Sequence, residues 1–369
     1  MAFINYTYFL FFSFYISSVF GKDIKLPQMI TKQNIHNLRF ISHDGKFTYF
    51  QTNQGELILS TNYESKSVLK KEPTTYFLLY ASPERKKIII ESSPTFFTSN
   101  NLKESHNLST IDYGTNKLAT LGVGISPKLH FQDSWASFYH ADTKILVLQN
   151  LNQSSFQFEI QLQNPINPFF APEVIMIDPN TVLFTDINKE GLYAIIKYTR
   201  AKNKSEVLFK ADTPGVKIEL CYKDNLLLFG QFPLSNINAQ SSITQLKING
   251  PEINFKNKEL LYSSTFPDIG NMTYISSENK LFFIKAGKPI GSLTQYPFDL
   301  FSLNLKNKEL KAITDFGFIT HAINMDEQIF VPYNGKYYIA LGEDTSKNDQ
   351  LKKIDVDEVI KKINDEIQK

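Results

Sequence analysis

The chain has 369 residues, of which 39 are Lys or Arg and 37 are Asp or Glu, so its formal net charge is +2. This near balance argues against a dedicated nucleic-acid-binding protein, which usually carries a basic patch or stripe. Hydrophobic residues make up 42% of the sequence, enough for a large core, and 16 Gly and 16 Pro are too few for a collagen-like or low-complexity chain.

The N-terminal segment has the pattern of a secretory signal peptide. From Tyr8 to Phe20 the sequence reads YFLFFSFYISSVF, with only Ser as a polar interruption. This run has the length of a signal-peptide apolar region and is short for a membrane-spanning helix. We therefore expect residues 1–21 to be removed by cleavage after Gly21, leaving 22–369 as the mature chain. The alternative is an uncleaved membrane anchor, but no second apolar segment of spanning length follows.

The single cysteine, Cys221, cannot form a disulfide within the chain. Secreted eukaryotic domains often contain disulfides, so their absence favours a bacterial periplasm or envelope. We expect a periplasmic or secreted protein with no transmembrane span in the mature chain.

A short pattern recurs along the mature chain: an acidic residue in a polar turn, followed by an apolar strand. Its seven copies are DGKFTYF from Asp44, ERKKIII from Glu84, DSWASFY from Asp133, DPNTVLF from Asp178, DNLLLF from Asp224, ENKLFF from Glu278 and DEQIFV from Asp326. Consecutive acidic residues are 40, 49, 45, 46, 54 and 48 positions apart. These spacings are close to the roughly 40–50-residue period of propeller blades.

Each copy is preceded by a short apolar run and followed by a third and often a fourth strand pattern. The hydrophobic residues alternate with period two, which indicates strands and not helices. The predicted fold is all-β, a seven-bladed β-propeller of four-stranded blades in a single domain, because radial repetition lets each sheet bury both faces. The expected blades are 35–73, 74–124, 125–169, 170–214, 215–264, 265–316 and 317–356.

Two segments compete as the strand that joins the ends of the ring: KDIKLPQMI, after the signal peptide, and LKKIDV from Leu351. Asp357 has the position of an N-cap for a short C-terminal helix, 357–369. The polar stretches SPTFFTSNNLKESHNLST from Ser93 and FPLSNINAQSSITQ from Phe232 are expected to be loops at the faces of the ring, where partners bind.

The stretch SHDGKFTYFQTNQGELILST from Ser42 resembles the repeat of TolB-like and WD-like β-propellers, also found in prolyl-oligopeptidase-type enzymes. That repeat reads Ser-Pro-Asp-Gly-Lys before an apolar strand; Ser42, Asp44, Gly45 and Lys46 match it, while His43 replaces the Pro. ASPERKKIII from Ala81 keeps Ser-Pro and loses Asp-Gly. The resemblance implies a propeller in an envelope or secreted setting, and it leaves the activity open.

Chemical motifs are sparse. His130, Asp133 and His140, in KLHFQDSWASFYH, are the nearest thing to a cluster, and they are candidates for the central channel. Polar residues on innermost strands more often line a wet channel or cap a turn, so we predict no catalytic residue, metal or cofactor. Cys221 is expected to be a buried inert thiol, and Trp135 to pack between blades. LGVGISP from Leu121 lacks the helix and Lys of a phosphate loop.

Two functions remain open from the sequence. The first is a non-enzymatic binding module that presents loops or the channel mouth to another envelope or extracellular protein, or to a polymer. The alternative is a propeller-type enzyme, a hydrolase or lyase, with its site at the central channel. The absence of a Gly-X-Ser-X-Gly motif favours the first.

Overall fold

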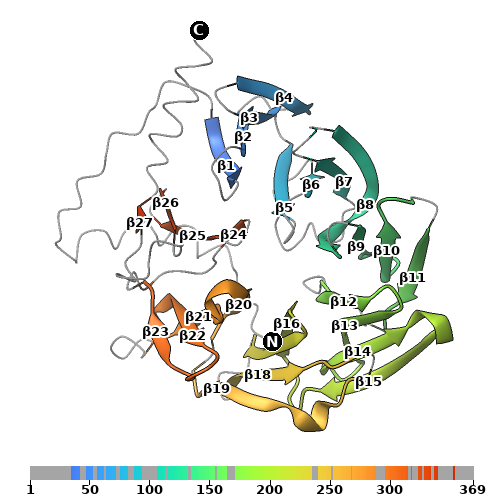
Figure 1. The fold of residues 1–369 in the computed structure, drawn as a ribbon, viewed down its shortest axis with the longest axis vertical. Coiled ribbons are helices and arrows are strands. Elements are labelled where there is room, and N and C mark those ends of the chain that lie inside the picture. The colour runs from blue at the N-terminus through green and yellow to red at the C-terminus, as the bar shows by residue number, and fades with distance from the viewer. Residues whose placement is uncertain are drawn as a thin grey trace, which may run out of the picture. The chain divides into compact units, whose positions relative to one another are not determined.

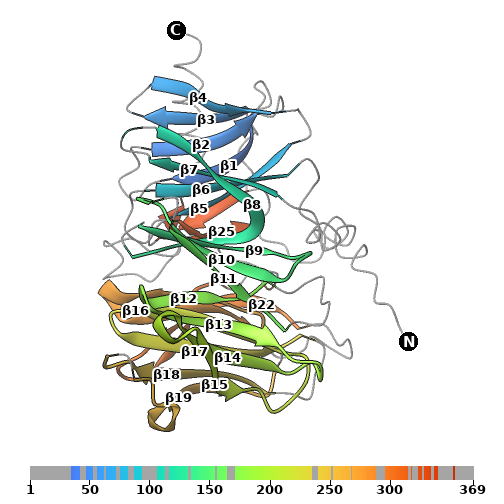
Figure 2. The same ribbon diagram turned by 90° about the vertical axis from the view of Figure 1, so that its right-hand side faces the viewer.

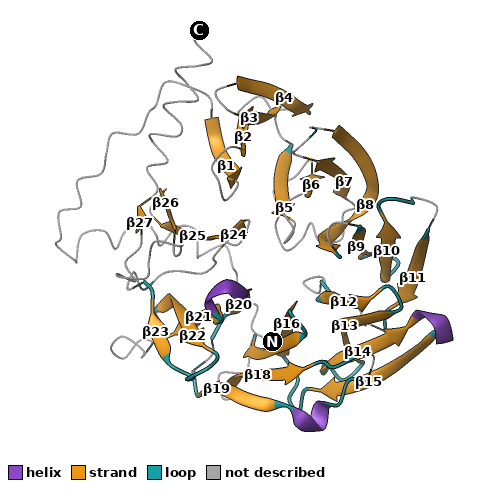
Figure 3. Ribbon diagram, in the orientation of Figure 1, coloured by secondary structure: helices purple, strands orange, loops and turns teal. Residues whose placement is uncertain are grey.

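A computed structural model of the chain describes residues 35–353 apart from segments between strands, of which the longest are 94–105, 164–170, 288–295 and 340–351. The chain divides into two units between Gln33 and Asn34, and every described residue belongs to the second unit. The described part is built of antiparallel β-sheets with three short 3-10 turns (Figure 3). The predicted all-β class is confirmed. None of the described helical segments has the length and apolar character needed to cross a membrane.

Five sheets have four strands each, paired in the order of the sequence. Their strands are β1 (Ile35–Ile41), β2 (Phe47–Thr52), β3 (Glu56–Thr61) and β4 (Glu64–Lys70); β12 (Val174–Asp178), β13 (Thr181–Ile187), β14 (Tyr193–Thr199) and β15 (Lys204–Lys210); β16 (Val216–Lys223), β17 (Leu226–Pro233), β18 (Ser241–Lys247) and β19 (Glu259–Ser264); β20 (Gly270–Ile275), β21 (Lys280–Ala286), β22 (Phe298–Asn304) and β23 (Leu310–Ala312); β24 (Ile323–Met325), β25 (Gln328–Tyr333), β26 (Lys336–Ile339) and β27 (Lys352–Lys353).

A sixth sheet has seven strands in the order β11-β10-β9-β8-β7-β6-β5. Its strands are β5 (Tyr76–Ala81), β6 (Lys87–Ser93), β7 (His106–Asp112), β8 (Lys117–His130), β9 (Trp135–His140), β10 (Ile145–Asn150) and β11 (Gln157–Gln161). The 14-residue strand β8 is the middle strand of this sheet. Residues 117–124 pair with β7, whereas Ile125 and residues 128–130 pair with β9, so two sets of four strands share β8.

Within the unit Asn34–Lys369, the first strand of each set lies toward the middle of the view and the later strands lie farther out (Figure 1). Seen from the side, β1–β4, β5–β11 and β12–β15 follow one another from top to bottom, while the later sheets overlap them in this view (Figure 2). β12 contacts β16, and β16 contacts β20, so the first strands of these three consecutive sheets are neighbours, and β12 also contacts β8, the middle strand of the seven-stranded sheet.

The core consists of apolar layers between consecutive sheets. One layer joins β6–β8 to β9 and β10 through Ile89, Leu108, Phe138 and Val147. A second, the largest, extends from β9–β11 across β12–β15 to β16–β18. A third joins β17–β19 to β21 and β22, and includes Leu228, Phe232, Leu281 and Phe283. Each described sheet in these layers is shielded from water by its neighbours, which is how radial repetition stabilises this class of fold.

The apolar runs that precede the acidic residues form the first strands, as predicted. EVIMI, IELCY and MTYIS, for example, fall on β12, β16 and β20. Left-handed residues close the turns that follow: Asp224 and Asn225 have φ of 51° and 62°, and Asn279 has φ of 52°. Asn and Asp tolerate this conformation better than other non-glycine residues, which explains why polar turns punctuate the strands.

Two predicted loops extend too far into strands. The stretch from Ser93 contains the start of β7, and the stretch from Phe232 contains the end of β17 and most of β18. The polar composition of these two stretches hides the alternation of buried and exposed residues that marks a strand. Leu108 and Ile243 are fully buried, although both have polar neighbours in the sequence. LKKIDV supplies β27, which pairs with β26. The segment KDIKLPQMI, the signal peptide at 1–21 and the helix at 357–369 lie outside the described residues.

Candidate functional site

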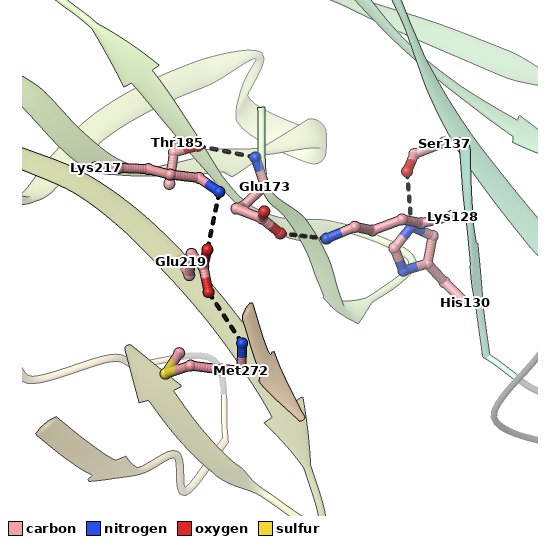
Figure 4. Close-up of polar contacts among 8 residues, drawn as sticks. All are labelled: Lys128, His130, Ser137, Glu173, Thr185, Lys217, Glu219 and Met272. Atoms are coloured by element: carbon pink, nitrogen blue, oxygen red, sulfur yellow. Dashed lines mark hydrogen bonds and ion pairs between the residues drawn. The ribbon is translucent and has the colours of Figure 1, made fainter. Parts of the chain in front are cut away.

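A network of charged side chains connects first strands of consecutive sheets (Figure 4). Lys128 comes from the second half of β8, and Glu173 immediately precedes β12. Lys217 and Glu219 come from β16, and the backbone of Met272 on β20 completes the series. We call these five residues the inner-strand network.

The first link of the inner-strand network joins β8 to the start of β12. Lys128 Nζ donates a hydrogen bond to Glu173 Oε2, and the two groups form an ion pair. The Glu173 backbone N–H donates to Thr185 Oγ1 on β13, with an N···O distance of 2.8 Å, which fixes the residue that carries the carboxylate. Partial burial would raise the pKa of Glu173, but the charges of Lys128 and Lys217 and the hydrogen bond from Lys128 lower it on balance.

The second link joins β16 to β20. Lys217 Nζ lies 2.8 Å from Glu219 Oε1, and the Met272 backbone N–H donates to Glu219 Oε2 at 3.0 Å. Burial lowers the pKa of Lys217, but the nearby carboxylates of Glu219 and Glu173 outweigh this and raise it. Lys217 is therefore protonated at neutral pH, and Glu219 links it to the next sheet.

The alternation of β16 places these groups. Lys217 and Glu219 share one face of the strand, while Ile218 and Leu220 on the other face are part of the largest apolar layer. Gly270 leaves room for the Glu219 carboxylate, because a Cβ at this position would lie 2.9 Å from Oε2 and 2.5 Å from the Phe232 ring. Gly270 also has φ of +87°, which favours glycine.

Of the sequence-predicted candidates, the two described residues, His130 and His140, do not lie together. His130 pairs with Trp135 at the start of β9, whereas His140 is the last residue of β9 and pairs with Ile145. The His140 ring packs edge-on against Phe138, with centroids 5.6 Å apart. Five residues of extended strand separate Trp135 from His140, roughly 17 Å. Asp133 lies outside the described residues.

His130 forms a pair that sequence reasoning missed. His130 Nε2 lies 2.9 Å from Ser137 Oγ on β9, the spacing of a nucleophile and its base. The Ser137 residue has no exposed surface, however. Burial, with a contribution from Lys128, lowers the pKa of His130 to about 3. A base this weak, beside a hydroxyl that no substrate reaches, indicates a hydrogen bond within the core.

A second buried polar cluster lies within the seven-stranded sheet, on β5, β6 and β7. Tyr80 OH donates to Glu91 Oε2 at 2.6 Å, and His106 Nδ1 lies 2.6 Å from Glu91 Oε1. Glu91 and His106 are both almost fully buried. Burial raises the pKa of Tyr80, and the Glu91 charge adds to this effect, so the phenol stays protonated and donates. This cluster could not be predicted, because His106 lies in a stretch expected to be a loop.

Buried carboxylates elsewhere bind backbone groups and hold connections between sheets. Asp186 Oδ2 accepts from the Gln163 N–H at 2.7 Å, which ties the segment after β11 to the end of β13. Asp268 accepts from the Ala286 N–H at 2.8 Å and from Tyr262 OH at 2.7 Å, and burial raises its pKa. These satisfied acids support the fold.

Trp135 takes the packing role expected for it, whereas Cys221 is half-buried and not fully buried as expected. Burial raises the pKa of the Cys221 thiol to about 11, so it is protonated at neutral pH. Trp135 is 3% exposed and packs edge-on against Phe156 and Phe158, within the largest apolar layer. LGVGISP lies within β8, where Gly124 packs against the Phe138 ring. Among the described side chains, no three His, Cys, Asp or Glu are grouped as metal ligands.

No protein-family model and no curated protein matches this sequence. Solved structures share its fold at low identity. The tricorn protease matches with a TM-score of 0.59 at 10% identity, over 87% of this chain and 34% of that protein. A prolyl endopeptidase matches with a TM-score of 0.52 at 10% identity, over 83% of this chain and 49% of that protein. TolB from Acinetobacter baumannii matches with a TM-score of 0.43 at 12% identity, over 74% and 61%.

This chain spans about a third to a half of the length of the two proteases. Identities of 10% to 12% speak for the fold alone. At that level the predicted resemblance to prolyl-oligopeptidase-type enzymes is confirmed by the match to the prolyl endopeptidase.

Proposed function

We propose that this chain is a secreted or periplasmic binding module that holds an acidic segment of another protein along its inner strands. The observation that carries the proposal is the inner-strand network. Lys128 and Lys217 keep 37% and 33% of their side chains exposed, whereas Glu173 and Glu219 keep 21% and 9%. The cations are thus the more accessible partners, and a ligand carboxylate can add a charge-assisted hydrogen bond to either ammonium group.

The proposed scaffold is a seven-bladed propeller, in which β8 serves as the last strand of the second blade and the first strand of the third. With β8 used twice, the described strands group into seven sets of four, in keeping with expected blades at 35–73, 74–124, 125–169, 170–214, 215–264, 265–316 and 317–356. β27 would be the outer strand of the last blade. Cleavage after Gly21 remains part of this proposal.

The alternative function, an enzyme with a channel site, has one observation in its favour, the Ser137–His130 pair. Its burial and the low pKa of His130 count against catalysis. If the pair were catalytic, Ser137→Ala would abolish any peptidase, esterase or glycosidase activity of the purified protein. We expect Ser137→Ala to leave the outcome of such a substrate panel unchanged.

Affinity capture from envelope extracts of the source cells tests the binding function. The bait is the full chain, compared with Lys128→Gln/Lys217→Gln and with a control, Lys189→Gln/Lys210→Gln, in which two exposed lysines outside the network lose the same charge. We expect one protein to be enriched by the wild type and the control and lost with the network variant. Direct titration of that purified protein then measures the difference, about tenfold or more for two charged hydrogen bonds.

Equal capture by all three baits, or enrichment of no protein, would remove the inner-strand network as the binding site. Enrichment of a polysaccharide in place of a protein would contradict the proposed ligand class. Thermal unfolding of each bait is measured first, and Lys128→Arg/Lys217→Arg, which keeps both charges, is expected to retain capture.

A further inference from the structure

The tripeptide Lys-Asn-Lys occurs at the same structural position in three consecutive sheets. Its copies are 202–204, 256–258 and 306–308. The first ends the connection from β14 to β15 and includes Lys204, the first residue of β15; the second lies between β18 and β19, and the third between β22 and β23. Each is therefore the turn between the third and fourth strands of its sheet, and we call the three the basic turns.

The basic turns are fixed in shape. Asn203 has φ of 44° and closes the short 3-10 segment Arg200–Lys202. Asn254 Oδ1 accepts from the Lys256 N–H at 3.0 Å, and Asn304 Oδ1 accepts from the Lys306 N–H at 2.9 Å, so the second and third turns have the same cap. Two of these turns are visible as the 3-10 segments next to β15 and β19 (Figure 3).

Each later turn lies against the outer strand of the preceding sheet. Lys258 Nζ is 4.8 Å from the centre of the Phe209 ring on β15. Lys308 Nζ is 2.7 Å from Glu259 Oε1 on β19 and 3.4 Å from the Leu260 carbonyl oxygen. The basic turns and the fourth strands of these sheets thus alternate along one outer edge of the fold, from β14 to β23, which we call the rim segment.

This rim segment concentrates positive charge. The basic turns carry six exposed lysines and Arg200 precedes the first of them, against the adjacent acids Glu206, Glu252, Glu259 and Glu309, which gives a local net charge of +3 in a chain whose total is +2. Glu259 is already engaged, because it receives hydrogen bonds from Lys308 and Gln245 that lower its pKa. The exposed cations therefore outnumber the acids available to them.

Exposed aliphatic side chains lie between the basic turns. Val207 on β15 is 60% exposed and Leu260 on β19 is 56% exposed, and among the described large hydrophobics only Leu234, also at 56%, is as exposed as Leu260. Basic residues interleaved with exposed aliphatic ones are the composition of surfaces that lie on anionic bilayers, where the ammonium groups meet headgroups and the apolar groups enter the acyl boundary.

We propose that the basic turns, together with Val207 and Leu260, form a docking surface for membranes that contain acidic phospholipids. Consecutive sheets of a propeller are related by rotation about one axis, so equivalent turns lie in one plane. A flat bilayer can therefore meet all three turns at once. This surface is separate from the inner-strand network and does not depend on the function proposed for it.

Vesicle cosedimentation tests the surface, with phosphatidylcholine alone and with phosphatidylcholine containing 30% phosphatidylserine. The readout is the phosphatidylserine-dependent part of binding, so that any contribution of residues 1–33, common to all variants, cancels. Lys256→Gln/Lys306→Gln should weaken this part by about 25-fold, since each lysine near an anionic surface contributes roughly fivefold. Lys256→Arg/Lys306→Arg should retain it.

The matched control is Lys70→Gln/Lys71→Gln, which removes two exposed lysines at the end of β4, in a sheet that carries no basic turn, and should change binding by less than threefold. Val207→Ser/Leu260→Ser, which alters no charge, should also weaken binding. Wild-type binding that is no stronger to phosphatidylserine vesicles overturns the proposal, as does equal loss in the control. Retention on heparin without vesicle binding would identify a soluble polyanion as the partner and would also overturn it.

Discussion

Replacing Glu219 with Ala tests whether the inner-strand network holds consecutive sheets together. The Met272 N–H would lose its acceptor, and a hydrogen bond to a charged group contributes about 1.5–3 kcal/mol. Lys217 would lose its closest partner, but this ammonium is a third exposed, so the pair adds at most about 1 kcal/mol. We expect Glu219→Ala to lower the free energy of unfolding by about 2–3 kcal/mol, measured by urea denaturation.

The control for this measurement is Glu190→Ala, which removes an exposed ion pair with Lys210 and should have no measurable effect on unfolding. Glu219→Gln should fall between wild type and Glu219→Ala, because its amide oxygen can accept from Met272 while its NH2 group faces Lys217. A Glu219→Ala protein that unfolds within about 0.5 kcal/mol of wild type would refute the assignment of this contact as a link between sheets.

Three further outcomes are expected. Gly270→Ala should destabilise the protein by about 2–4 kcal/mol in urea, because it adds a methyl group at positive φ against the Phe232 ring; an unchanged midpoint would contradict this packing. Cys221 should react with a disulfide reagent at pH 8 roughly 100-fold more slowly than in urea-unfolded protein, since its thiol pKa is about 11; equal rates would contradict its burial. The folded-state pKa of Glu173 lies below its ordinary value of 4.5, so its contribution to stability is present above that pH and is lost as pH falls below it. The free energy of unfolding of Glu173→Gln should lack this part of its dependence on acid pH. Superimposable profiles of unfolding free energy against pH for Glu173→Gln and the wild type would contradict the pairing with Lys128.

The strand content of the fold could be predicted because local signals and the final structure agree. The runs on β12 and β16 alternate with period two, and the turns between strands contain Asn and Asp that accept left-handed backbone. The continuity of β8 could not be predicted. Its two glycines and Pro127 indicate a turn, yet the strand continues past them, with Ser126 at φ of 51° and a shift of register between Ile125 and Lys128 where the partner changes from β7 to β9.

The inner-strand network could not be predicted, because its contacts join residues far apart in the chain. Lys128 and Glu173 are 45 residues apart, and Glu219 and Met272 are 53 apart. Charged residues that alternate with apolar ones look like ordinary solvent-facing positions, as Lys217 does. His130 and His140 were candidates because they are near each other in the sequence. The extended strand between them places them far apart in the fold.

The shared strand β8 affects how the described sheets open locally. In stacked-repeat proteins, each unit opens with a free energy set by itself and its neighbours. Because one uninterrupted strand serves both sets, backbone amides from β5 to β11 should exchange with deuterium as one cooperative block, while each four-stranded sheet can fray independently. Strands β5 to β11 would then be the most cooperative part of the described fold.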